Sequence, residues 1–346
     1  MSCTESNDIS AAAAPNVSTA TVPAEVCEAV RGAEKIALIA HVTPDADCIG
    51  TIGAMHLALA ELGKQTFTSL PAGTVARKMV FLLEKTGLKP ASVDELAACD
   101  LAIVMDTAKA RRVNVEGKLD ALPGVPVLNI DHHATNTQFG RWNWVEGDAS
   151  STSELIYLLI RALGCQVTPT IATLIYAGMH MDTQGFSLSN TTTRSLQVAG
   201  ELASAGADII DCCEKLNRSL SRSEFELVKV VYKNTQVSED GRLGWSTASY
   251  DEINEAGCHA NDIDDQVEIV RSIEGVKVAV LFSEGNRDKI RMNFRGERGI
   301  SILELAKKFG GGGHRASAGA IQDGSIDEVV KQVLPAAKEF AAALPD

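Results

Sequence analysis

The sequence predicts an α/β protein in which a parallel-sheet domain is followed by a smaller α+β domain. In the first part, short apolar runs alternate with longer segments of helical periodicity, which is typical of parallel sheets. Acidic residues and histidines directly follow several of these runs. A polar segment that ends in glycine then precedes a part with a different order of strands and helices. The length of 346 residues is sufficient for two domains.

The first domain is expected to cover residues 23–233. Short apolar runs predict its strands at residues 35–40, 64–69, 101–105 and 125–130. A helix with small residues near its start is expected at residues 48–62. Helical periodicity then predicts further helices at residues 151–163, 169–181, 192–205 and 221–233.

Residues 234–241 are polar and are expected to form a linker. The second domain then covers residues 242–346. Its predicted strands are residues 242–249, 276–282 and 289–294, and its predicted helices are residues 262–273, 301–309 and 326–343. Residues 1–22, which are rich in Ala, Ser and Thr, are expected to be a disordered tail.

The composition limits the classes of partner. The net charge is −13, whereas a protein that holds long nucleic acid by its backbone usually presents a basic face. No apolar stretch is long enough to span a membrane. Eight scattered cysteines without a CxxC pair are typical of reduced thiols in a cytoplasmic protein. We therefore expect a cytoplasmic protein that binds neither long nucleic acid nor membranes.

Four separate places in the first domain carry residues that are able to hold metal ions. Three of them follow predicted strands and one closes a helical pattern. The carboxyl ends of parallel strands meet at one rim of a sheet, so these side chains are expected to converge. Carboxylates mixed with imidazoles suit a pair of divalent transition ions, a common device for hydrolysing phosphate esters. The candidates are His41, Asp45, Asp47, Asp106, His132 and Asp182.

The spacing suggests how these ligands would divide between two ions. Asp45 and Asp47 are one residue apart in a loop and are able to face different ions, with His41 beside Asp45. Asp106 would bridge both ions. His132 and Asp182 would complete the ligands of the second ion. A single aspartate at a strand end is more often a turn or cap residue, so the prediction rests on the combination.

A glycine run in the second domain indicates a phosphate-binding site. Residues 310–313 are four glycines after a predicted helix, and their backbone could approach a ligand closely. His314 and Arg315 follow, and Arg291, Arg295 and Arg298 lie just before this helix. The structural alternatives are a flexible turn after a helix and a solvated charged edge.

Together these motifs resemble the DHH phosphoesterase superfamily. The first motifs are His41-x-x-Pro44-Asp45-x-Asp47, Asp106-Thr107 and Asp131-His132-His133, and Asp182-Thr183-Gln184-Gly185 is a looser match. The glycine run with His314 resembles the DHH-associated C-terminal domain. Within the superfamily, the layout is similar to the bifunctional oligoribonucleases and pAp phosphatases, the nanoRNases.

The resemblance implies a role for each motif residue. The six metal candidates would bind two divalent ions, Mn²⁺ in this family. His133 would act near the scissile phosphate, and Asp131 would support the histidines. Arg295, Gly311, Gly312, Gly313 and His314 would hold the substrate.

The implied activity is that of a manganese-dependent phosphodiesterase and phosphatase that acts on short oligoribonucleotides (nanoRNA) or 3'-phosphoadenosine 5'-phosphate (pAp). Cyclic di-AMP, or its linear product pApA, is the alternative substrate. The usual Ser-Lys after the arginine is replaced here by Gly296-Glu297, which affects substrate specificity. The glycine run disfavours a pyrophosphatase, and the complete ligand set disfavours a non-catalytic nucleotide-binding module. The expected partners are a short RNA or nucleotide and a second copy of the chain in a homodimer.

Overall fold

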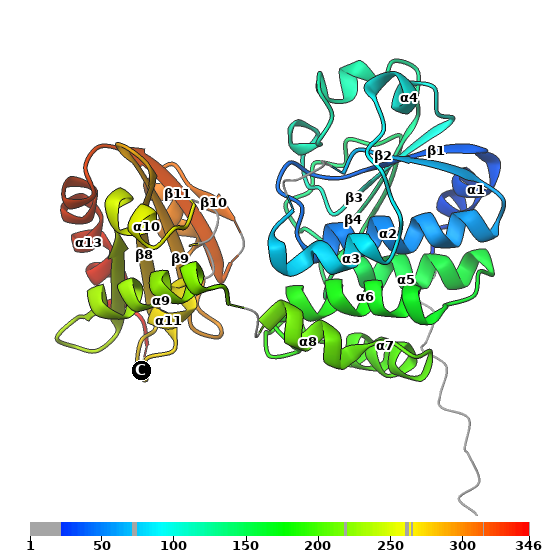
Figure 1. Ribbon diagram of the computed structural model, residues 1–346. Coiled ribbons are helices and arrows are strands. Elements are labelled where there is room, and N and C mark those ends of the chain that lie inside the picture. The colour runs from blue at the N-terminus through cyan, green and yellow to red at the C-terminus, as the bar shows by residue number, and fades with distance from the viewer. Residues whose placement is uncertain are drawn as a thin grey trace, which may run out of the picture. The chain divides into compact units, whose positions relative to one another are not determined.

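The computed structural model describes residues 22–70, 75–217, 220–259, 263, 266–313 and 315–345. These residues form two compact units, one that ends before Leu220 and one that begins there (Figure 1). The expected tail lies outside the described residues except for Val22, and so does His314.

The described part of the first unit contains a parallel sheet of five strands, as the sequence predicts (Figure 1). The order across the sheet is β2 (Gln65–Thr68), β1 (Lys35–Ile39), β3 (Leu101–Met105), β4 (Val127–Asp131) and β5 (Trp142–Val145). The strand β5 was not predicted, because it is a short edge strand whose residues are mostly only partly buried. The sheet places the ends of β1, β3 and β4 side by side.

Both faces of this sheet are covered, which explains why its strands read as continuous apolar runs. Ile36, Leu38 and Ile103 face a core shared with the long helices, whereas Ala37 and Val104 face a smaller core on the other side. The long helices are α2 (Ala46–Glu61), α5 (Thr152–Leu163) and α6 (Pro169–Asp182), with α7 (Thr193–Ser204) and α8 (Ile209–Asn217) beyond them (Figure 1). Shorter helices are α1 (Ala24–Gly32), α3 (Val80–Glu84) and α4 (Val93–Ala97).

Helices α2 and α6 approach each other at backbone distance. A Cβ atom added to Gly50 on α2 would lie 2.4 Å from the carbonyl oxygen of Leu174 on α6. One added to Gly178 on α6 would lie 2.9 Å from the Cα atom of Asp47 on α2. Only glycine fits at these two positions, so they determine how closely the start of α2 lies to α6.

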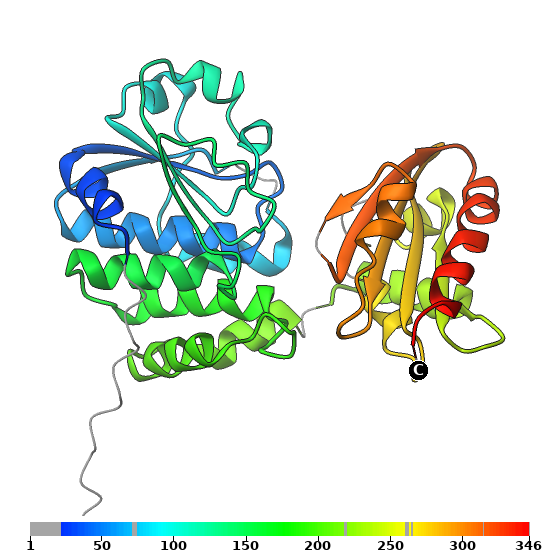
Figure 2. The ribbon, with the colours of Figure 1, turned by 180° about the vertical axis from the view of Figure 1, so that it is seen from behind.

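The second unit has a mixed sheet of six strands within its described residues, with helices on both faces (Figure 2). The order is β10 (Gly312–Gly313), β11 (Ser317–Asp323), β9 (Lys289–Gly296), β8 (Val278–Asn286), β7 (Leu243–Ala248) and β6 (Gln236–Val237). Helices α12 (Leu303–Lys308) and α13 (Ile326–Ala342) cover one face, and α9 (Arg222–Asn234), α10 (Tyr250–Glu255) and α11 (Val267–Arg271) cover the other.

The boundary between the units lies earlier than the sequence suggested. Helix α9, expected at the end of the first domain, buries Leu227 and Val231 in a core with Ile253 and Leu281 of the second unit. Residues 236–237 of the expected linker form β6, which pairs with β7. Strand β11 was not predicted either, because its first residues are small and resemble a loop.

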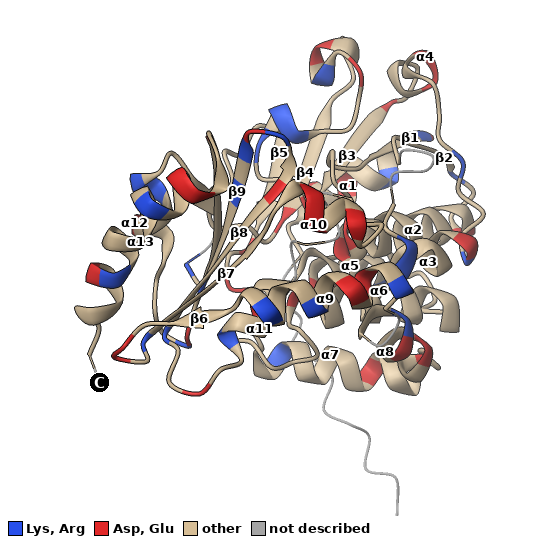
Figure 3. Cartoon of the chain, turned by 60° about the vertical axis from the view of Figure 1, so that its left-hand side comes forward, with Lys and Arg blue, Asp and Glu red and all other residues tan. Residues whose placement is uncertain are grey.

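Charge, helix length and cysteine pairing are three further features of the described residues. Lys and Arg are interspersed with Asp and Glu over the elements drawn in Figure 3. None of the described helices is long and apolar enough to cross a membrane. The seven cysteines among the described residues form no disulfides with one another.

Candidate metal centre

Three of the predicted ligands follow β1. His41 and Asp45 lie in the loop, and Asp47 lies in the first turn of α2. Asp45 is the N-cap of α2, and its Oδ1 accepts hydrogen bonds from the backbone N–H groups of Asp47 and Cys48 at 3.1 and 3.0 Å. Asp47 is fully buried, and its carboxylate accepts backbone N–H bonds from Thr152 at 2.7 Å and Ser153 at 2.8 Å. These donors form the first turn of α5, where the helix dipole favours a negative charge.

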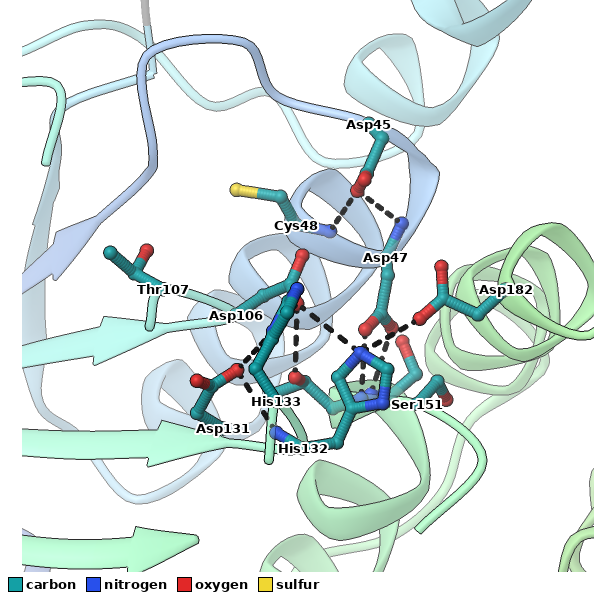
Figure 4. A network of polar contacts seen from close by, with 12 residues as sticks. Asp45, Asp47, Cys48, Asp106, Thr107, Asp131, His132, His133, Ser151 and Asp182 are labelled. Carbon is teal, nitrogen blue, oxygen red and sulfur yellow. Dashed lines mark hydrogen bonds and ion pairs between the residues drawn. The ribbon is translucent and has the colours of Figure 1, made fainter. Parts of the chain in front are cut away.

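Asp106 follows β3 directly and has an unusual backbone conformation. Its φ angle is 53°, in the left-handed region that few non-glycine residues adopt. Its backbone N–H donates to Ile130 O at 3.0 Å, and its Oδ1 accepts from the Thr152 hydroxyl at 3.2 Å. Figure 4 shows its carboxylate pointing toward the histidines that follow β4. Backbone strain of this kind is often found at functional sites.

The Asp131-His132-His133 motif stands at the end of β4. Asp131 is fully buried, and its Oδ1 accepts from the backbone N–H of His132 at 2.9 Å and lies 2.7 Å from Nδ1 of His133. Its Oδ2 accepts from the Asn136 amide at 2.6 Å, which also donates to Asn129 at 2.8 Å. Asp131 therefore contacts both motif histidines, and it is absent from the possible ligand groups found among the described residues.

The predicted ligands converge into overlapping groups (Figure 4). Nε2 of His41 lies 3.5 Å from Asp106 and 3.9 Å from Asp45. Nε2 of His132 lies 3.1 Å from Asp182 and 3.7 Å from Asp106. The groups found among the described residues are His41-Asp45-Asp106, Asp47-His132-Asp182 and Asp106-His132-His133, each with ligand atoms within 4.8 Å of one another.

The electrostatics of these groups favour a bound cation. Burial alone would lower the pKa of His132, but its hydrogen bond to Asp182 and the charges of Asp106 and Asp47 raise the pKa well above the ordinary value. Burial raises the pKa of Asp182 to about 6, although His132 opposes this change. Burial and the neighbouring Asp182 also raise the pKa of Asp47. A divalent cation held between these crowded carboxylates would favour their ionised forms.

In the second unit, Arg295 on β9 and the last two glycines of the run on β10 lie on opposite sides of β11, which pairs with both strands. Arg295 on β9 pairs in register with Ser317 on β11, and Gly312 on β10 pairs with Gly319 on β11. Nε of Arg295 donates to Glu268 at 3.1 Å, which also binds Arg271 at 2.6 Å. This arginine is therefore held in place, and its charge is partly balanced.

The three glycines predicted to bind substrate have different surroundings. A Cβ atom at Gly311 would lie 2.3 Å from the carbonyl oxygen of Gly319, and one at Gly313 would lie 2.6 Å from that of Ser317. Nothing lies within 4 Å of a Cβ at Gly312. Gly311 and Gly313 are thus required for packing against β11, which leaves Gly312 as the open position.

The chain matches the sequence profiles of two known domains. The DHH family, N-terminal domain, matches residues 35–179, and the DHHA1 domain matches residues 246–343. The chain is 34% identical over 323 residues to the bifunctional oligoribonuclease and PAP phosphatase NrnA of Thermus thermophilus, across 91% of this chain and 92% of that relative. The chain belongs to the DHH family.

Two further comparisons extend this result. The NrnA protein of Bacillus subtilis is 30% identical over 296 residues, which span 83% of this chain and 89% of that relative. An exopolyphosphatase-related protein from Bacteroides fragilis has the same fold, with a TM-score of 0.83 over 92% of this chain and 96% of that one, at 24% identity. The DHH-family sequence and the DHH-family fold therefore agree over most of the chain.

The DHH motifs did not identify every residue that builds the site. Thr152 and Ser153 hold Asp47 through their backbone N–H groups, and Asn136 holds Asp131. The run of Ser and Thr at residues 150–153 is a typical signal for a helix start, and it overlaps the start of the predicted helix at residues 151–163. The sequence alone contains no sign that this helix start would face Asp47.

Proposed function

We propose that this DHH-family chain is a metal-dependent hydrolase that cleaves short oligoribonucleotides and removes phosphate from pAp, with two Mn²⁺ ions at its site. The main support is the position of Asp106. It belongs to the group His41-Asp45-Asp106 and lies 3.7 Å from His132 of the group Asp47-His132-Asp182. Two relatives, which are 34% and 30% identical to this chain over most of its length, are named for these two activities.

The residues of each group would hold one ion. The ions would supply positive charge to the phosphate oxygens and lower the pKa of bound water. Burial alone would lower the pKa of His133, but its hydrogen bond to Asp131 and the charge of Asp106 raise it. Asp131 holds the ring of His133 at Nδ1, so this histidine would be oriented to act near the scissile phosphate.

The DHHA1 domain would bind the rest of the substrate. Arg295 offers positive charge, and Gly312 lets a phosphate approach the backbone. Together with His314, these residues provide contacts for a few phosphates only, which suits pAp and RNAs of very few nucleotides. We also expect a homodimer and a cytoplasmic location.

A side-by-side turnover assay with Mn²⁺ tests the proposal. The substrates are pAp, an RNA dinucleotide, cyclic di-AMP and pyrophosphate, at equal concentration and salt. We expect pAp and the dinucleotide to be hydrolysed faster than the other two. Preference for cyclic di-AMP would identify a cyclic-dinucleotide phosphodiesterase instead. Binding without turnover of any substrate would identify a non-catalytic module.

A further inference from the structure

Asp47 is held by a segment that is itself held from another helix. Both oxygens of the Asp47 carboxylate accept backbone N–H bonds from Thr152 and Ser153, at 2.7 and 2.8 Å. The position of this carboxylate therefore depends on residues 150–153, the approach to α5. Whatever holds this segment also determines the geometry of the Asp47-His132-Asp182 group.

A buried carboxylate fixes that segment. Glu154 is fully buried, and its Oε2 accepts from the backbone N–H of Ser150 at 2.9 Å and from the Ser150 hydroxyl at 2.5 Å. Its Oε1 is paired with Nε of Arg194 on α7. A buried carboxylate without a cation is costly, so this contact with Arg194 holds Glu154 in place.

Arg194 also connects this segment to the histidine motif. Both Nη atoms of Arg194 donate to Oε2 of Glu146 at 3.0 Å. The other carboxylate oxygen of Glu146 accepts from the Trp144 indole at 2.8 Å, and its backbone N–H donates to Asp131 O at 3.1 Å. One guanidinium thus joins the start of α5 to the loop after β5, beside Asp131.

A neighbouring residue reaches Asp182. The Asn190 amide donates to Ser150 O at 2.9 Å and to Asp182 O at 3.1 Å. The segment that leads into α7 therefore contacts the supports of Asp47 and the backbone of Asp182. By contrast, the hydrogen bonds of the Asp45 carboxylate stay within the start of α2. The contacts of Arg194 thus favour the second ligand group over the first.

We propose that Arg194 is a positioning residue that sets the metal affinity of the Asp47-His132-Asp182 group. This inference rests on the proposed function, because it takes both groups as metal sites. Without the guanidinium, Glu154 is a buried charge that lacks its partner, and residues 150–153 shift away from Asp47. Substitution of residues that support metal ligands typically weakens metal binding by about 10–100-fold. The His41-Asp45-Asp106 group should lose less affinity, because residues 150–153 contact it through the Thr152 hydroxyl, which donates to Asp106 at 3.2 Å, rather than through backbone N–H groups.

The test compares Arg194→Gln with the control Arg161→Gln. Arg161 also joins α5 to α7, through Glu201 at 3.2 Å, but its side chain is largely exposed and contacts no residue of the segment 150–153 in the described structure. Mn²⁺ binding is titrated by electron paramagnetic resonance of the free ion, with folding checked by circular dichroism. We expect two ions in the parent and in Arg161→Gln. In Arg194→Gln we expect the ion of the Asp47-His132-Asp182 group to bind roughly 10–100-fold more weakly and the other ion to change less.

Arg194→Lys is the second variant, in case Arg194→Gln does not fold. Lysine retains the charge beside Glu154 but lacks the fork that reaches Glu146 at the same time. We expect a folded protein in which binding of the second ion is weakened more than binding of the first. Equal weakening of both ions, or no weakening, in a folded variant would overturn the role of Arg194. A parent protein that binds a single ion would overturn the two-metal function as well, so the two failures are distinguishable.

Discussion

The Oδ2 atom of Asp106 lies 3.5 Å from Nε2 of His41, and the other carboxylate oxygen faces His132 at 3.7 Å. One carboxylate therefore borders both ligand groups. It does so from a left-handed backbone conformation, whose cost is about 1–3 kcal/mol. This relationship makes Asp106 the most direct test of a two-ion site.

Asp106→Asn should remove turnover and most of the bound Mn²⁺. Asparagine tolerates the left-handed conformation and keeps the side-chain shape, so the loss reports the missing negative charge rather than strain. Bound metal is measured by mass spectrometry after gel filtration, together with turnover of pAp. Asp120→Ala, at an exposed aspartate, is the control. Normal turnover in Asp106→Asn would rule out a bridging role.

His133→Ala should lower kcat while the bound metal stays near two ions. A positioned acid or base typically contributes about 10²–10⁴-fold to the rate. His133 also falls within one possible ligand group with Asp106 and His132, so the metal content distinguishes the two roles. Loss of an ion in this variant would make His133 a ligand.

Gly311→Ala should lower the stability of the protein, whereas Gly312→Ala should raise KM for the substrate. The alanine Cβ at residue 311 meets the Gly319 carbonyl oxygen, so we expect a loss of about 1–3 kcal/mol in the free energy of unfolding. At residue 312 the space is open, so stability stays near that of the parent while KM for pAp rises. Thermal unfolding and steady-state kinetics measure the two effects. An unchanged KM for Gly312→Ala would remove this glycine from the substrate site.

Metal should stabilise the protein more at neutral than at acidic pH. In the metal-free protein, the pKa of Asp182 is raised from 3.8 to about 6, so its contribution to stability is present below 3.8 and is lost as pH rises through 6. The raised pKa values of Asp47 and His132 act in the same direction. Metal binding needs the ionised carboxylates and the neutral imidazole, so it releases protons.

The measurement for this prediction is the Tm with EDTA and with Mn²⁺, at about pH 5 and about pH 8. The increase caused by Mn²⁺ should be larger at the higher pH. Calorimetry in two buffers of different ionisation enthalpy should show proton release on binding. An equal Tm increase at both pH values would contradict the assignment of these side chains as ligands.

The rate should fall as the RNA substrate becomes longer. Each phosphate held in a basic groove adds a salt-sensitive contribution to binding, and this chain has a net charge of −13. Initial rates on RNAs of increasing length, at fixed Mn²⁺ and salt, should peak at a few nucleotides. Rates that keep rising beyond about ten nucleotides would indicate a long-strand exonuclease, because such grooves track roughly 4–16 nucleotides per module.

The sequence predicts the first sheet and the convergence of its ligands because both depend on local patterns. Strands β1, β3 and β4 are buried on both faces, so their apolar runs are unmistakable, and each is followed by a polar motif residue. The placement of α9 could not be predicted. It depends on contacts of Leu227 with residues that follow it at some distance in the chain.

The supports of the site were also beyond sequence patterns. The bond from Thr152 to Asp47 joins residues 105 positions apart, and that from Arg194 to Glu154 joins residues 40 apart. Neither has a local signature, because each partner alone resembles an ordinary helix-cap or surface residue. Only the folded chain brings these pairs together.

The contact between α2 and α6 has a consequence for the evolution of this sequence. These helices carry Asp47 and Asp182, and they touch through main-chain atoms at Gly50 and Gly178. Backbone atoms in close contact cannot repack as side chains can. Substitutions of core residues elsewhere should therefore alter stability without widening the distance between the two carboxylates. Descendants of this sequence can therefore vary widely in their interiors and still keep the same spacing of Asp47 and Asp182, provided that these two glycines persist.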